Sequence, residues 1–128
     1  MREILCRGKS ETTLEWVIGY YFKTYCKTGI QERGHFKYIN VIPETVGQYT
    51  GRNIGEDEIF DGDILENSTG IYVVYWHDEY LLWGTKNKKG NDCYSLRTLL
   101  SDKKRPCKKI GNIHDNPELL EGDINDRD

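Results

Sequence analysis

The side chains in this sequence best suited to chemistry are four cysteines and three histidines. A structural zinc site needs cysteine or histidine pairs separated by roughly two to four residues, and the sequence contains no such pair. A cysteine nucleophile would meet its histidine in space, so this alternative stays open, but nothing marks one thiol as activated. We predict no metal, no cofactor and no catalytic residue. We also predict that the cysteines are free thiols that mostly pack in the interior; the residues concerned are Cys6, Cys26, Cys93 and Cys107, with His35, His77 and His114 as the histidines.

A second candidate site is a group of three carboxylates, Asp61, Asp63 and Glu66. Clustered carboxylates suit hard cations such as calcium. The calcium-loop pattern, however, needs a third oxygen ligand before its central glycine and a later glutamate, and the spacing here does not supply them. Because Asp and Gly favour turns with or without a ligand, we interpret these residues as a tight turn that precedes a new strand at Ile64. The pair His77-Asp78 is likewise interpreted as a solvated turn.

Nucleic-acid binding is the alternative function, because small β-barrels often bind single strands through exposed aromatic rings beside cationic loops. The chain has nine tyrosines and three tryptophans. Its pI of 5.6 argues against this function, since dedicated nucleic-acid-binding proteins are usually basic. Nucleic acid is therefore a possible but not a favoured partner, and its candidate contacts are Trp83, Lys86, Lys88, Lys89, Lys103, Lys104 and Arg105.

The elements that must position these groups are predicted to be mainly β-strands. Residues 15–25 are rich in aromatic and β-branched side chains that alternate at period two, which is typical of a strand. Residues 29–34 are polar and bounded by glycines, which favours a loop, and residues 35–42 return as a second strand. These two strands would form a hairpin after a short first strand over 2–7 that ends in a turn at Gly8.

The second half of the chain is predicted to be a meander of three strands followed by a short helix. Residues 71–76 form a continuous apolar run between turn residues, which indicates a buried strand, and residues 80–83 are its expected antiparallel partner. A cationic turn then leads into the third strand. Three leucines at helical spacing predict one or two helical turns before Pro106. A last strand over 108–113 would close the sheet.

A glycine-punctuated connector joins the two halves, and residues 42–65 read IPETVGQYTGRNIGEDEIFDGDIL. Pro43 lacks a backbone N–H and ends the preceding strand. Gly47, Gly51 and Gly55 permit turns with positive φ, so we predict that the chain turns repeatedly here. Near the end of the chain, Asn116 precedes a proline at the first helical position, which predicts a helical turn capped by the asparagine side chain.

The connector, the opening Arg7-Gly8-Lys9 and the closing residues 110–120 together resemble the signature of the YopX family of bacterial and phage proteins. The resemblance covers nearly the whole chain, apart from residues 29–34 and 86–106. It implies a protein encoded by a phage or prophage and an SH3-like barrel in the C-terminal half. It implies no activity, because none is assigned to the family.

We therefore predict a mainly β fold: an N-terminal β-hairpin unit plus a C-terminal small SH3-like barrel or roll, with short helical turns. The expected domains are residues 1–56, which hold the hairpin unit and connector, and residues 57–120, which form the barrel. Residues 121–128 are acidic and poor in apolar side chains, so we expect them to be disordered.

The predicted function is that of a non-catalytic, oligomeric interaction or accessory protein. The hairpin carries large apolar groups on both faces, so we expect a second copy of the chain to cover one face, with an unknown protein as a further partner. Candidate interface residues are Tyr21, Ile39 and Val41. No apolar run approaches the roughly 20 residues of a membrane span, and early charges interrupt any signal peptide. We expect no membrane partner and a location in the cytoplasm of the bacterial host.

Overall fold

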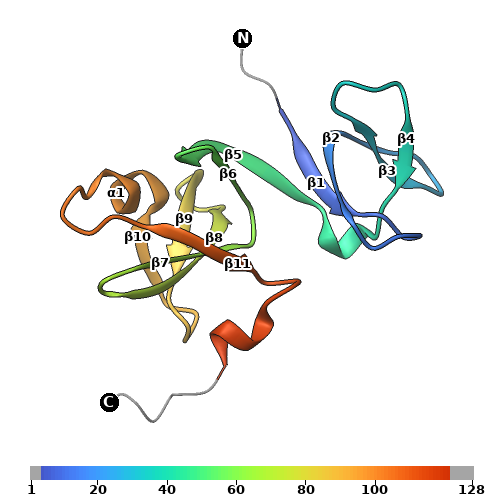
Figure 1. Ribbon diagram of the computed structural model, residues 1–128. Coiled ribbons are helices and arrows are strands. Elements are labelled where there is room, and N and C mark those ends of the chain that lie inside the picture. The colour runs from blue at the N-terminus through green and yellow to red at the C-terminus, as the bar shows by residue number, and fades with distance from the viewer. Residues whose placement is uncertain (1–3, 122–128) are drawn as a thin grey trace. The chain divides into compact units, whose positions relative to one another are not determined.

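The computed structural model describes residues 4–121, and the chain forms two compact units. Unit 1 is Met1–Gly51 and unit 2 is Arg52–Asp128. Both are built from antiparallel strands with few helical residues, so the predicted mainly β fold is confirmed (Figure 1). The acidic segment 121–128, predicted to be disordered, lies outside the described residues except for Glu121.

Unit 1 is a meander whose hydrogen-bonded order is β4-β3-β2-β1-β5, and β5 ends in unit 2 (Figure 1). Its core holds four buried side chains, Cys6, Val17, Ile30 and Val41. The elements are β1 (Cys6–Lys9), β2 (Trp16–Lys23), β3 (Thr28–Glu32), β4 (Tyr38–Asn40), the 3-10 turn η1 (Pro43–Thr45) and β5 (Gly47–Ile54).

The loop predicted over residues 29–34 is wrong, because most of it belongs to strand β3. Its Ile30 is fully buried and holds the strand against the core. The glycine that suggested a loop is needed for close packing: a Cβ at Gly29 would lie 2.6 Å from the Phe22 ring. A Cβ at Gly19 in β2 would likewise overlap with the backbone carbonyl of Gln31. These glycines mark close approaches between strands, and a sequence does not distinguish them from turn glycines.

Two further predictions of turns need correction. The first strand begins at Cys6 and runs through Gly8, which therefore does not end it. Gly47 lies inside β5, whereas Gly51 and Gly55 have the predicted positive φ of 86° and 61°. The connector thus combines a short 3-10 turn with a long strand, because its backbone pairs with β1 at Cys6.

Unit 2 contains a five-stranded antiparallel sheet in the order β10-β9-β8-β7-β11, and β6 pairs with β5 (Figure 1). The predicted last strand exists but joins β7, far from β10, so the sheet stays open and the closed barrel is not formed by the described residues. The elements are β6 (Asp57–Phe60), β7 (Asp63–Asn67), β8 (Gly70–His77), β9 (Leu82–Lys86), β10 (Asp92–Ser95), α1 (Leu96–Ser101), β11 (Lys108–Asn112) and the 3-10 turn η2 (Pro117–Leu120).

The core of unit 2 lies between this sheet and α1, and includes Leu96 and Leu99 as the leucine spacing predicts. Ser95 caps the helix, because its hydroxyl accepts from the Thr98 N–H at 3.1 Å. Strand β8 is half-buried, which corrects the prediction of a fully buried strand: alternate residues face the core, and Trp76 is 41% exposed. Within residues 4–121, no helix has the length and apolar character that crossing a lipid bilayer requires.

Candidate functional site

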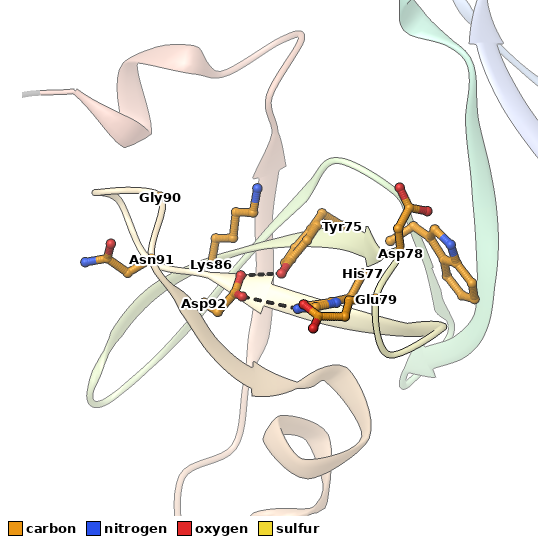
Figure 2. A pocket seen from close by; sticks show the side chains of 9 residues that line it. Tyr75, His77, Asp78, Glu79, Lys86, Gly90, Asn91 and Asp92 are labelled. Carbon is orange, nitrogen blue, oxygen red and sulfur yellow. Dashed lines mark hydrogen bonds and ion pairs between the residues drawn. The ribbon is translucent and has the colours of Figure 1, made fainter.

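Unit 2 carries an open polar pocket of about 590 Å³, formed by β8, β10 and the turns that connect them to β9 (Figure 2). It holds three carboxylates, one ammonium and several aromatic rings, which makes it a candidate site for a polar or charged ligand. The lining residues are Tyr75, Trp76, His77, Asp78, Glu79, Lys86, Gly90, Asn91 and Asp92.

The alternation of side chains along β8 places Tyr75 and His77 in the pocket. Tyr75 and His77 are two residues apart in a strand, so both side chains leave the same face of the sheet. In β9, Gly84 pairs with Tyr75 and has no side chain. A Cβ there would lie 3.3 Å from the Tyr75 ring, so the glycine lets the ring lie across β9 toward β10.

Asp92, at the start of β10, contacts both the Tyr75 and the His77 side chain through its carboxylate. One carboxylate oxygen accepts a hydrogen bond from the Tyr75 hydroxyl, and the other lies 3.2 Å from His77 Nε2 (Figure 2). The Tyr80 N–H donates to His77 Nδ1 at 3.3 Å, so the neutral ring carries its proton on Nε2 and donates it to Asp92. Both imidazole nitrogens are therefore engaged.

Two aromatic contacts complete the cluster. The Tyr80 ring stacks on His77 with centroids 4.6 Å apart. Lys86 Nζ lies 4.2 Å from the centroid of the Tyr75 ring, a cation–π distance. The His77 side chain is only 14% exposed and the Asp92 side chain is 59% exposed, so the carboxylate is the accessible member of the pair.

Desolvation, and then the hydrogen bond and charge of Asp92, raise the pKa of Tyr75 to about 12. In return, the Tyr75 hydroxyl lowers the pKa of the Asp92 carboxyl, with help from His77 and Lys86. The cluster therefore favours a neutral tyrosine beside an ionised aspartate. Any stability that Tyr75 adds is present below the ordinary tyrosine pKa of about 10 and is lost as the pH rises toward about 12.

We expect Asp92→Asn to lower the pKa of Tyr75 toward the ordinary tyrosine value, because it removes the carboxylate charge next to the hydroxyl. NMR of isotope-labelled tyrosine, followed as the pH is raised, measures this pKa after assignment with Tyr75→Phe. Asp102→Asn is the matched control, since Asp102 bonds Arg105 and no tyrosine. The same Tyr75 pKa in both asparagine variants would contradict the assigned coupling.

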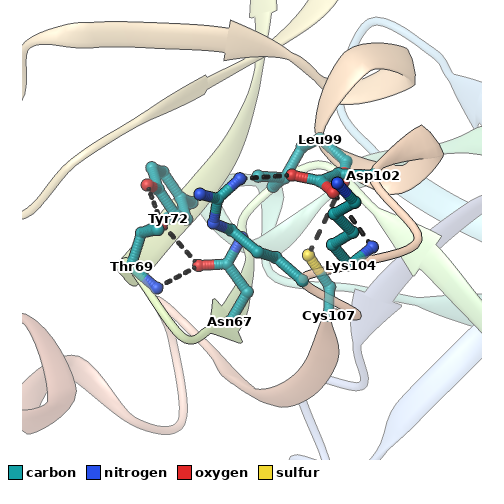
Figure 3. Close-up of polar contacts among 8 residues, drawn as sticks. Asn67, Thr69, Tyr72, Leu99, Asp102, Lys104 and Cys107 are labelled. Carbon is teal, nitrogen blue, oxygen red and sulfur yellow. Dashed lines mark hydrogen bonds and ion pairs between the residues drawn. The ribbon is translucent and has the colours of Figure 1, made fainter.

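The structure does not gather the seven predicted nucleic-acid contacts on one surface. Trp83 and Lys86 leave opposite faces of β9, and Trp83 packs against the core of unit 2, 5.2 Å from the Trp76 ring. Lys88 and Lys89 lie in the turn before β10. The other three, Lys103, Lys104 and Arg105, follow α1, beyond the opposite end of β10, and Asp102 engages two of them through a 3.0 Å ion pair with Arg105 and the Lys104 N–H (Figure 3).

The three predicted interface residues have different environments in unit 1. Tyr21 and Ile39 both lie opposite Ile30, on neighbouring sides of β3, so they share one face of the sheet. Tyr21 is 43% exposed, and Ile39 is half-buried against the core. Val41 is only 1% exposed and is itself a core residue, so its own chain already covers it.

The four thiols are free, as predicted, but they do not all pack in the interior. Cys6 is part of the core of unit 1, and Cys107 is half-buried beside the Leu99 carbonyl (Figure 3). Burial raises the pKa of both these thiols, which makes them poorer nucleophiles. Cys26 and Cys93 are exposed, which corrects the expectation that they pack.

The three predicted carboxylates do not converge on a common point. Asp63 is fully buried, and its Oδ2 accepts from the Phe60 N–H at 2.7 Å and lies 3.2 Å from Lys109 Nζ. Glu66 instead pairs with Lys108 at 3.7 Å. The part of the chain that the structure describes has no cluster of three or more His, Cys, Asp or Glu side chains able to hold a metal ion. The predicted Asp-Gly turn is present, with Gly62 at a φ of 90°.

The segments that carry the family resemblance are used for structural hydrogen bonds. Thr45 in the connector accepts from the Lys9 N–H at 2.9 Å and donates to the Ile42 carbonyl. In the closing segment, Asn112 accepts from two backbone N–H groups, and its own N–H donates to Asn116 Oδ1 at 3.2 Å. This corrects the predicted cap, because the Asn116 side chain turns back to β11 and does not cap η2.

Tyr75 and Asp92 were absent from the sequence prediction of the site, and His77 was considered only as a possible partner of a cysteine nucleophile and as part of a turn. His77 ends strand β8 and faces the pocket, so the prediction of a solvated turn at this residue is wrong. The alternation of Tyr75 and His77 was a usable signal, but the third member belongs to another strand. Only the pairing of β8, β9 and β10 brings it within reach.

Comparison with known proteins found one family model that matches the chain. The model described as YopX protein matches residues 7–121, which is nearly the whole chain. No curated protein and no solved structure matches it.

Proposed function

The chain belongs to the YopX family, and from that premise we propose that it is a non-catalytic protein that acts by self-association and by contact with another protein. In this proposal it is an accessory protein of a phage or prophage and acts in the cytoplasm of the bacterial host. The observation that carries the proposal is that unit 1 leaves large apolar side chains exposed, among them Tyr21, Phe36 and Tyr38.

Two of these side chains, Phe36 and Tyr38, lie at the edge strand of unit 1. Strand β4 has three residues and is the last strand in the sheet order of residues 4–121, although its Asn40 carbonyl accepts from the Glu11 N–H at 3.1 Å and Val41 after it forms an isolated bridge with Ser10. Tyr38 within it is 66% exposed, and Phe36 just before it is 95% exposed. Exposed apolar groups next to a sheet edge favour burial against a second chain, by face packing or by edge pairing.

Two features support the non-catalytic part of the proposal. Both nitrogens of His77 are hydrogen-bonded, so neither is free to take a proton from a substrate. The segments shared with the family supply fold-stabilising contacts at Thr45, Asp63 and Asn112. We also propose that unit 2 is related to SH3-like barrels, although its five-stranded sheet is open.

Single-strand nucleic-acid binding is the less favoured alternative. Trp83 is turned toward the core while Lys86 faces the opposite side of the sheet. The pocket beside Lys86 also contains three carboxylates, which would repel phosphates. The dispersed cations therefore give this function less support than the exposed apolar groups give self-association.

We expect Tyr21→Glu to reduce the mass measured by light scattering behind a sizing column toward the 15.0 kDa of one chain. A buried glutamate at a self-association surface carries a large desolvation cost. Tyr25→Glu is the matched control: Tyr25 is fully exposed at the tip of the turn between β2 and β3 and is not part of the proposed surface, so the same new charge there should leave the mass unchanged. Val41→Glu is unsuitable, since it would place a charge in the core of the unit itself.

A native protein that stays at 15.0 kDa at high micromolar concentration would refute self-association. Equal masses for the native chain and Tyr21→Glu, both above the mass of one chain, would instead move the interface away from Tyr21. Far-ultraviolet circular dichroism of each variant confirms that the fold is retained.

A further inference from the structure

We infer that the pocket formed by β8 and β10 binds a lysine or arginine side chain of a partner polypeptide. This inference rests on the proposed interaction function and deepens it, because it gives that function a site and gives the partner a chemistry.

The rim of the pocket offers negative charge that the chain does not neutralise. Asp78 and Glu79 are exposed, and neither forms an ion pair or side-chain hydrogen bond with any residue in 4–121. Figure 2 shows Glu79 beside His77, with Lys86 on the other side of Tyr75. Figure 2 also shows the Asp78 carboxylate pointing away from Glu79, so an incoming ammonium or guanidinium would meet Glu79 at the end of the pocket opposite Lys86 and Asp78 on another side of the rim.

An aromatic platform lies beside these carboxylates. Tyr80 is not among the residues that line the pocket, but one face of its ring stacks on the lining residue His77, and the residue is 67% exposed. Cations bind aromatic faces through the ring quadrupole, and guanidinium groups also stack on them. A carboxylate next to an exposed ring is the combination that a basic side chain recognises with both its charge and its plane.

The chain itself already places an ammonium on an aromatic ring in this pocket. Lys86 Nζ lies 4.2 Å from the Tyr75 ring, and its charge helps to lower the pKa of Asp92. Asp92 is held by Tyr75 and His77 while its side chain stays 59% exposed, so lone pairs remain for a further donor. Lys86 thus already occupies the Tyr75 ring and acts on Asp92, so its positive charge would repel a cation that enters the pocket.

Because the carboxylates attract a cation and Lys86 repels it, removing the carboxylates and removing Lys86 should change the affinity for a cationic peptide in opposite directions. The probe is a capped peptide of alternating arginine and glycine, and the control peptide has citrulline, an uncharged isostere, in place of arginine. At low salt, isothermal titration calorimetry should detect the arginine peptide only. We expect the double variant D78N/E79Q to weaken binding about tenfold, or about 1.4 kcal/mol, because it removes two exposed carboxylates that attract the cation. K86Q should strengthen it about threefold, because it removes a like charge.

The control variant is Glu118→Gln, which removes one exposed carboxylate outside the pocket. It should leave the affinity unchanged, whereas general attraction between an acidic protein and a basic peptide would be weakened by it too. Equal affinities for the native chain, D78N/E79Q and K86Q would overturn the inference. Free arginine amide that binds as tightly as the peptide would also overturn it, because the ligand would then be a small cation.

The outcome is separable from that of self-association. A chain that is monomeric by light scattering but binds the arginine peptide with these variant effects would refute self-association and keep the pocket. An oligomer that ignores the peptide would refute the pocket and keep self-association.

Discussion

Asp63→Ala is expected to lower the unfolding free energy by about 3–5 kcal/mol, because it leaves one half of a buried ion pair without its partner. Asp63 is fully buried, and it holds both the Phe60 N–H and Lys109 Nζ. Without Asp63, the Lys109 side chain stays about three-quarters buried beside the Phe60 ring, and its Nζ keeps a hydrogen bond only to the Glu58 carbonyl. Urea denaturation of the full chain, followed by tryptophan fluorescence, measures the change.

Asp57→Ala on the neighbouring strand β6 is the matched control, since Asp57 is exposed and its loss should change stability by no more than about 0.5 kcal/mol. Lys109→Met should be as harmful as Asp63→Ala, because it strands the buried carboxylate. The double variant D63A/K109M should recover part of the loss, since neither charge is then left without its partner. A double variant whose loss equals the sum of the two single losses would contradict the coupling of these residues.

Gly19→Ala is expected to cost about 3 kcal/mol or to prevent unit 1 from folding, because the new methyl group would overlap with the backbone of β3. The overlapping atom is the Gln31 carbonyl oxygen, which belongs to a paired strand and cannot rotate away. Circular dichroism during thermal unfolding compares the variants, and expression in inclusion bodies would be the extreme form of the same result.

The same substitution at two other glycines provides an internal scale. At Gly29 the methyl group would meet the edge of the Phe22 ring at 2.6 Å, and a ring can shift, so the cost should be about 1–2 kcal/mol. At Gly84 the nearest atom is 3.3 Å away on the Tyr75 ring, so the cost should be smaller still. Any other order of the three losses would show that strand spacing does not set the requirement for glycine.

Local patterns were sufficient for much of unit 2. The helical spacing of Leu96 and Leu99 predicted α1, and the Asp-Gly pair predicted the turn before β7. The apolar run at 71–76 correctly predicted strand β8, although its burial was overestimated, since both faces of a strand can be apolar when only one meets the core. Each of these signals lies within a few residues, where backbone geometry and side-chain period act directly.

The same reasoning failed where one residue has two physical uses. Gly29 and Gly47 were interpreted as turn residues, but both lie in strands. A glycine permits positive φ and also permits close approach of another strand, and only the neighbouring strand decides which property is used. The misplaced loop at 29–34 also hid Ile30, and with it the fact that the core of unit 1 already covers Val41.

The sequence by itself determined the β-rich character of the chain, the short helix, the free thiols and the family, because composition, period and motif are local properties. Only the tertiary structure decided that Asp63 meets Lys109, and that Asp92 reaches Tyr75 and His77 across the glycine of β9. These contacts depend on strand order and register, and a one-residue change of register would turn every side chain concerned to the opposite face. For that reason the candidate site became visible only after the strands were paired.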